Sequence, residues 1–208
     1  MVSIDKIKIN DITLNVLFQS VYTVFTQFGM LILPIIVIYS FNIDYKEKNI
    51  LFYQLLDINE ITYFLTKVGV LIFWFSLYIF IFNTLTCILY KDFSKFMIMF
   101  AYYENVVIFY VLIVSCIAFL FNNLISSFCL NLFLWISSIV ASTVSESLGF
   151  LAYYDASSKL YQNLLLYLET NNTSYISIFN SFTYNLLTFI LVTSLIYIFK
   201  KRWKKNGI

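Results

Sequence analysis

The sequence predicts an all-α integral membrane protein, a bundle of about five transmembrane helices with short amphipathic helices at the interface. Of its 208 residues, 61% are hydrophobic and only 12% are charged, whereas soluble domains carry about 25% charged residues. The mean hydropathy is +0.85. Four long stretches, residues 12–43, 68–90, 105–145 and 170–199, carry no formal charge. Because about 20 apolar residues cross a hydrocarbon core, three stretches are long enough for one span and 105–145 for two.

The first 41 residues are predicted to hold one interfacial segment and one span. Residues 1–19 alternate polar and apolar side chains, a pattern typical of a segment lying along the membrane interface. The first span is predicted at residues 20–41. It contains Pro34, the only proline of the chain, and we expect a kink there because proline removes a helical hydrogen bond.

The next segment, residues 44–67, differs in composition from the spans around it. It carries seven charged residues, and its apolar residues recur at helical spacing. We therefore expect a short amphipathic helix outside the bilayer. Residues 149–180 are also moderately polar, which predicts an outer segment with short helices that do not cross the membrane. The remaining spans of this single transmembrane domain, residues 1–208, are predicted at 68–90, 99–121, 124–147 and 181–199.

The basic residues orient these elements. Five of the 13 lysines and arginines lie in the last nine residues, directly after the last span. Such a cluster stays on the cytoplasmic side of the cell membrane, which puts segment 44–67 in the cytoplasm and 149–180 outside. Eight basic residues are then inside and five outside. No second basic face accompanies the cluster, so membrane lipid and not nucleic acid is its expected contact.

Residue types needed for most catalytic sites are missing. The chain has no histidine, which excludes His-based triads and HExxH zinc sites. Its three cysteines, Cys87, Cys116 and Cys129, fall in apolar runs, as buried hydrophobic residues do. The phosphate-binding sequence GxxxxGKS/T does not occur. We therefore predict no catalytic residue, no metal site and no cofactor on this chain, and expect it not to be an enzyme.

A few polar residues fall inside the predicted spans, where polar groups are costly. On the fourth span Ser127, Asn131, Ser138, Ser142 and Glu146 recur at spacings of four and seven, which puts them on one helix face. This stripe predicts either close helix packing or a hydrated translocation path. Glu104 and Glu146 lie near the outer ends of their spans. There each is either exposed at the boundary or lines an outer vestibule that attracts cationic peptides.

Segment 44–67 reads DYKEKNILFYQLLDINEITYFLTK and resembles the segment after the second span in membrane subunits of type-2 ATP-binding-cassette exporters. Lys48 and Ile58 depart from that family, which has a glycine and a proline there. The order of the later spans agrees, while the family's usual first span has no counterpart here. The positions that match are the acids Asp44 and Glu47, the pair Leu55-Leu56 and the closing Lys67, while Lys48-Asn49 stands where the family has a Gly-Thr-like step.

The resemblance implies a permease subunit that pairs with a second copy or a sister subunit. It also implies a separate cytoplasmic ATPase subunit that holds ATP and Mg²⁺. Small subunits of this composition resemble those of antimicrobial-peptide export or immunity in low-GC Gram-positive bacteria. The expected substrate is then a peptide or amphipathic molecule exported across a bacterial cell membrane. The implied ATPase-coupling residues are Asp44, Lys46, Glu47, Lys48, Leu55, Leu56, Asp57 and Lys67.

Three alternatives stay open. Segment 44–67 can instead rest on lipid headgroups as an interfacial helix. The chain can be an immunity or assembly protein that binds a peptide or another membrane protein without ATP. An intramembrane enzyme is disfavoured because Glu104 and Glu146 have no recognisable nucleophile or metal partner. A neighbouring gene for an ATPase would favour the exporter.

Overall fold

The computed structural model of the protein describes residues 13–201 and 203, and this part of the chain is helical without strands. Five helices are long and apolar enough to cross a membrane, which confirms the predicted fold class. They are α1 (Leu14–Lys46), α3 (Glu60–Tyr90), α4 (Phe96–Leu120), α5 (Leu124–Val144) and α7 (Ile178–Ile198). The shorter elements are the helices α2 (Asn49–Leu55) and α6 (Lys159–Thr170) and the 3-10 helices η2 (Glu146–Ala152) and η3 (Thr173–Tyr175).

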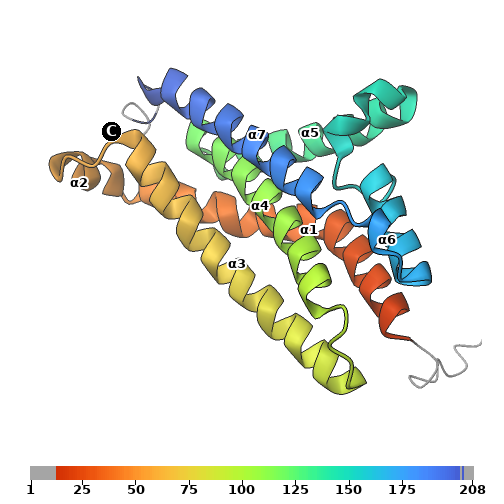
Figure 1. The fold of residues 1–208 in the computed structure, drawn as a ribbon. Helices are drawn as coiled ribbons and strands as arrows, with labels where there is room; N and C mark the ends of the chain where they lie inside the picture. The colour runs from red at the N-terminus through yellow and green to blue at the C-terminus, as the bar shows by residue number, and fades with distance from the viewer. Residues whose placement is uncertain (1–12, 202, 204–208) are drawn as a thin grey trace, which may run out of the picture.

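Helix α4 is the centre of the bundle and runs between α3 and α7 (Figure 1). In its most apolar 18-residue stretch 72% of the residues are buried, against 17% in α3 and 11% in α5. Apolar residues that stay exposed on α3 and α5 need lipid or another protein around them, because water would disfavour so large an apolar surface. The outer helices therefore present faces to the membrane, while α4 contacts mainly protein.

Contacts between distant segments define two ends of the bundle. At one end, Tyr45 donates a hydrogen bond to the carbonyl of Phe119 at 2.8 Å, and Asn42 donates to the carbonyl of Asn122 at 2.5 Å. At the opposite end, Asn15 donates to the carbonyl of Leu168 at 2.8 Å. Helix α2 and the α4–α5 turn thus share one end, and α6 lies with the start of α1 at the other.

Helix α1 begins earlier than the predicted first span. Its N-cap is Thr13, whose hydroxyl accepts a hydrogen bond from the backbone N–H of Val16. Phe18 is fully buried, so residues 14–19 belong to the packed helix and not to an interfacial segment. Residues 1–12, the rest of that prediction, lie outside the described residues. The helix contains Pro34 and changes direction along its length, as its red and orange parts show (Figure 1).

The two helices around segment 44–67 both extend into it. Helix α1 continues to Lys46, beyond the predicted end at residue 41, and α3 begins at Glu60, before the predicted start at residue 68. The Asn59 side chain caps α3 by accepting a hydrogen bond from the N–H of Thr62 at 2.8 Å. Only residues 47–59, which we call the α1–α3 connection, lie between the two long helices.

The other predicted spans differ from the helices by a few residues at their ends. Helices α4 and α7 begin three residues earlier than predicted. Helix α5 ends at Val144, before the predicted end at residue 147, and the 3-10 helix η2 begins two residues later. Between α5 and α7 the chain forms η2, α6 and η3. One prediction about cysteines is wrong: Cys87 and Cys116 are buried, but Cys129 is exposed, because it lies on a face of α5 that no described helix covers.

Candidate functional site

The α1–α3 connection carries exposed apolar side chains outside the long helices. On α2 and directly after it, Phe52 is 59% exposed, Leu55 82% and Leu56 56%. Ile50 of the same helix is fully buried in the core of the bundle. Helix α2 therefore has one face packed on the protein and one apolar face that none of the described residues covers. We call Phe52, Leu55 and Leu56 the α2 apolar surface.

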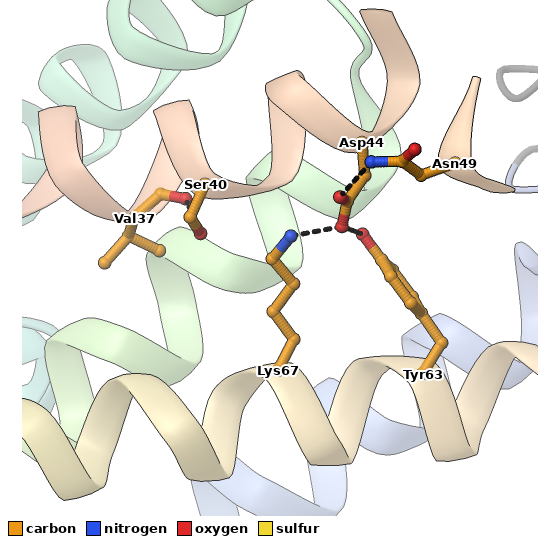
Figure 2. Close-up of polar contacts among 6 residues, drawn as sticks. All are labelled: Val37, Ser40, Asp44, Asn49, Tyr63 and Lys67. Atoms are coloured by element: carbon orange, nitrogen blue, oxygen red, sulfur yellow. Dashed lines mark hydrogen bonds and ion pairs between the residues drawn. The ribbon is translucent and has the colours of Figure 1, made fainter. Parts of the chain in front are cut away.

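Helix α2 is held in place by a group of polar residues that we call the Asp44 cluster: Asp44, Asn49, Tyr63 and Lys67. Asp44 is buried near the end of α1, and its carboxylate forms an ion pair with Lys67 of α3 (Figure 2). The same carboxylate accepts hydrogen bonds from the Tyr63 hydroxyl at 2.9 Å and the Asn49 side chain at 3.2 Å. One carboxylate thus joins α1, α2 and α3.

Charge and hydrogen bonding together make this arrangement favourable. A buried carboxylate is costly unless it is paired with an opposite charge and hydrogen-bonded, and Asp44 has both kinds of partner. The Lys67 side chain is only 19% exposed, and its ammonium lies 5.3 Å from the centre of the Phe41 ring. The Asp44 cluster therefore lets α1 and α3 keep charged residues at their packed ends.

Aromatic rings surround the cluster. The Tyr63 ring lies 5.4 Å from the ring of Tyr53 on α2 and 5.4 Å from that of Trp203. Trp203, which follows α7, is 1% exposed. Burial, and then the negative charge of Asp44, raise the pKa of the Tyr53 hydroxyl, which therefore stays neutral. The chain after α7 thus packs on the same end of the bundle as α2.

Both ends of α2 have residues in the left-handed region. Lys48 before the helix and Asp57 after it have φ of 56°, a conformation that favours glycine. Lys48 is the position where the resembling exporter subunits have a glycine. The conformation required there is therefore the one that a glycine would supply, although this chain has a lysine.

The eight predicted coupling residues fall into two groups. Asp44 is buried and Lys67 half-buried, and they pair with each other. Their geometry fits a role in holding the α1–α3 connection rather than in contacting another protein. The remaining six, Lys46, Glu47, Lys48, Leu55, Leu56 and Asp57, are exposed on or beside α2.

The predicted polar stripe on α5 is only partly brought together. Asn131 and Ser138 line a cavity of about 440 Å³ between α4, α5, α7 and residues 150–155. Ser127 is buried and donates to the Phe121 carbonyl at 3.4 Å, while Ser142 donates to the Ile139 carbonyl of its own helix.

Of the two predicted glutamates, Glu104 does not line this cavity. Glu104 of α4 accepts a hydrogen bond from Ser76 of α3 at 2.5 Å, so it bridges two helices. Glu146 is the first residue of η2, and its side chain lies outside the described part.

Several residues that complete the candidate site are not predicted from the sequence. Tyr63 precedes Lys67 by four residues, which puts both on one face of a helix, so this spacing was a usable signal. Asn49 and Tyr53 gave no such signal, because their contacts depend on how α2 folds back on α1 and α3. The contact of Trp203 with Tyr63 joins positions 140 residues apart and has no signature in the sequence.

The fold and this surface define a class of protein: a multi-pass helical membrane protein whose described residues present a short apolar helix beside the ends of its spans. The comparisons with known proteins give the family. The chain belongs to the YydJ family of peptide export permease proteins, whose model matches residues 1–208. This membership confirms the resemblance to exporter permease subunits. Permeases are transport proteins, so the family does not indicate an enzyme.

One curated relative illustrates the family. The chain is 30% identical over 213 residues to the probable peptide export permease protein YydJ of Bacillus subtilis (strain 168). The alignment covers all of this chain and 87% of that protein. No solved structure matches the chain.

Proposed function

We propose that this chain is the membrane subunit of a bacterial peptide exporter, and that a separate cytoplasmic ATPase drives it by binding the α2 apolar surface. The observation that carries the proposal is the exposure of Leu55 and Leu56 on a segment that the Asp44 cluster joins to two spans. The family description supports peptide export. ATP and Mg²⁺ belong to the partner in this proposal.

The geometry supports a mechanism of coupling by rigid attachment. A partner that covers Leu55 and Leu56 would bury two leucine side chains, each worth about 1.5–3 kcal/mol. Movement of that partner would be transmitted to α1 through Asp44 and to α3 through Lys67 and Tyr63, because all three meet at one carboxylate. Small shifts of packed helices of this kind are an established form of conformational switching.

The exposed charges fit the edge of such an interface. Lys46, Glu47, Lys48 and Asp57 flank the apolar residues in the sequence, are exposed, and include both signs of charge. An apolar centre with a polar rim is the usual anatomy of a protein interface. A helix that only rests on lipid headgroups, the alternative, needs no protein partner for Leu55. A second permease copy or a sister subunit would complete the transport unit.

A co-purification experiment tests the proposal. The chain is co-expressed with the ATPases encoded by neighbouring genes, and the Leu55→Asp/Leu56→Asp variant is compared with the unmodified protein. We expect the variant to insert into the membrane and to lose the ATPase, since two carboxylates would have to be buried at the interface.

A matched control replaces two exposed leucines at the opposite end, Leu148→Asp/Leu166→Asp, and should retain the ATPase. Equal recovery of the ATPase with the Leu55→Asp/Leu56→Asp variant would exclude the α2 apolar surface as its binding site.

A further inference from the structure

The cavity between α4, α5 and α7 has an apolar, aromatic lining with one unusual residue. Phe109, Trp135, Tyr153 and Tyr184 contribute rings to its wall. Its volume of about 440 Å³ lies within the range of about 300–1,000 Å³ found for small-ligand sites. Its polar lining residues include Asn131, Ser138, Asp155 and Thr188, and of these four only Asn131 of α5 has a buried side chain without a hydrogen-bond partner among the described residues.

Asn131 is 1% exposed, and neither its side-chain oxygen nor its nitrogen has a hydrogen-bond partner among the described residues. A buried amide left unpaired costs about 1–3 kcal/mol. Leucine or alanine would fill this position of an apolar helix without that cost. The amide offers one acceptor and two donor hydrogens, which a group entering between α5 and its neighbours can satisfy.

The outer wall of the cavity is fastened to α7. Tyr184 donates a hydrogen bond to the carbonyl of Phe150 at 2.7 Å, and its ring stacks on that of Tyr153 at 4.4 Å. Tyr154 donates to the carbonyl of Ser181 at 3.1 Å. The segment after α5 thus closes the cavity toward the end of the bundle opposite α2.

We propose that this cavity binds a short apolar or aromatic stretch of peptide in extended form, and that Asn131 pairs with one of its backbone amide groups. This inference rests on the proposed function, since the peptide class comes from it. A peptide group has one donor and one acceptor, as the Asn131 amide requires. A lipid acyl chain would fill the apolar volume but would leave both atoms unpaired. Asp155, the one charged residue that the described part of the chain contributes to the lining, disfavours an acidic peptide.

The test uses the purified chain in lipid nanodiscs, without any ATPase. The probe is a capped leucine–bromophenylalanine–leucine peptide, and its matched analogue carries methyl groups on every backbone nitrogen. Bromine quenches tryptophan fluorescence at short range, and Trp135 lines the cavity. The quenching measured in the Trp135→Phe variant comes from the other tryptophans. Subtracting it from the quenching of the unmodified protein leaves the contribution of Trp135.

We expect the unmodified protein to bind the probe about fivefold more tightly than the methylated analogue, the factor for one net hydrogen bond. The near-isosteric Asn131→Leu variant should bind both peptides equally. Ser142→Ala, a change on the same helix away from the cavity lining, should keep the preference.

Equal binding of the two peptides by the unmodified protein would overturn the inference, and so would a preference retained in Asn131→Leu. The comparison of the two peptides on the unmodified protein does not depend on whether any variant folds. The result of this binding experiment is independent of the result of the co-purification experiment. The Leu55→Asp/Leu56→Asp variant should still bind the probe, and the Asn131→Leu variant should still recover the ATPase.

Discussion

At the scale of single residues, Asp44 is the most connected polar group of the candidate site. It is the carboxylate that pairs with Lys67 and accepts from Tyr63 and Asn49. The sequence pattern indicates both Asp44 and Lys67 but predicts that they face a partner. Their charge suggested exposure, whereas the structure pairs them with each other. Pairing of this kind cannot be read from a hydropathy pattern, which treats each charge separately.

The ion pair makes a thermodynamic prediction. Asp44→Asn should destabilise the protein by about 2 kcal/mol, because Lys67 loses its charged partner in a partly buried site. Lys67→Met should also destabilise, because it leaves a buried carboxylate without an opposite charge. The double variant Asp44→Asn/Lys67→Met should be more stable than the sum of the single changes predicts.

Thermal unfolding in detergent, followed by tryptophan fluorescence, measures these differences. Lys46→Met, a change at an exposed lysine on the same helix, is the control and should have little effect. Additive effects of the two single changes would show that Asp44 and Lys67 do not interact.

The backbone at Lys48 leads to a second residue-scale prediction. With φ of 56°, this residue adopts a conformation that costs an L-residue about 1–2 kcal/mol and glycine almost nothing. Lys48→Gly should therefore raise the thermal midpoint, and Lys48→Val should lower it. Lys46→Gly, at a helical position two residues earlier, should give no gain. A lower midpoint for Lys48→Gly would contradict the left-handed conformation.

At the scale of elements, α6 is fastened to the start of α1 by a buried lysine. Lys95 is 7% exposed, and its ammonium donates to the Asn15 side chain at 2.8 Å and to the Leu168 carbonyl at 3.3 Å. Burial lowers the pKa of Lys95, and the charge of Asp92 opposes that shift. Because the C-terminal end of a helix is partly negative, a cation near the last carbonyls of α6 is favourable.

The loss of this cation should loosen α6 specifically. Lys95→Met leaves the Asn15 oxygen without its donor and should weaken the attachment of α6 by about 1 kcal/mol. Hydrogen exchange should become faster in α6 and stay unchanged in α2. Lys91→Met, at an exposed lysine of the same turn, should change neither. Unchanged exchange in α6 would mean that Lys95 does not hold it.

The pKa shift gives this attachment a pH dependence. Burial disfavours the charged form of Lys95, and this destabilising contribution is complete only below the lowered folded-state pKa. It declines only as the pH rises through the lowered folded-state pKa toward the ordinary value of Lys, about 10.4. Protection of α6 from exchange, corrected for the intrinsic exchange rate, should therefore not depend on this lysine below its lowered pKa and should change only as the pH rises through it.

The elements themselves were predictable to different degrees. The five spans follow from the uncharged stretches because the thickness of the bilayer fixes the length of a helix that crosses it. The helix ends do not follow, because a charged residue marks the limit of a span in a hydropathy pattern. Asp44 lies inside α1 and Lys67 inside α3, where each neutralises the other. Asn105 and Asn185, which bond across α4 and α7 at 2.9 Å, are 80 positions apart and gave no sign of their pairing.

At the scale of the whole molecule, the arrangement of ends relates the chain's orientation to its function. The contact of Trp203 with Tyr63 puts the end of α7 beside the α1–α3 connection. Lys200 and Lys201 follow α7 directly, and basic residues at the end of a span stay in the cytoplasm. The α2 apolar surface is therefore expected on the cytoplasmic side, where an ATPase can reach it. The cavity that Asn131 lines would then lie toward the outer half of the membrane, beneath the segment after α5 that closes it.

The most direct measurement is cysteine labelling in intact cells. In a variant with Cys87, Cys116 and Cys129 replaced by serine, Leu55→Cys is treated with a membrane-impermeant maleimide. We expect no labelling until the cells are permeabilised, and protection from labelling when the ATPase is co-expressed. Leu166→Cys on α6, at the opposite end, should be labelled from outside. Labelling of Leu55→Cys in intact cells would contradict the proposal, because no cytoplasmic ATPase could then contact α2.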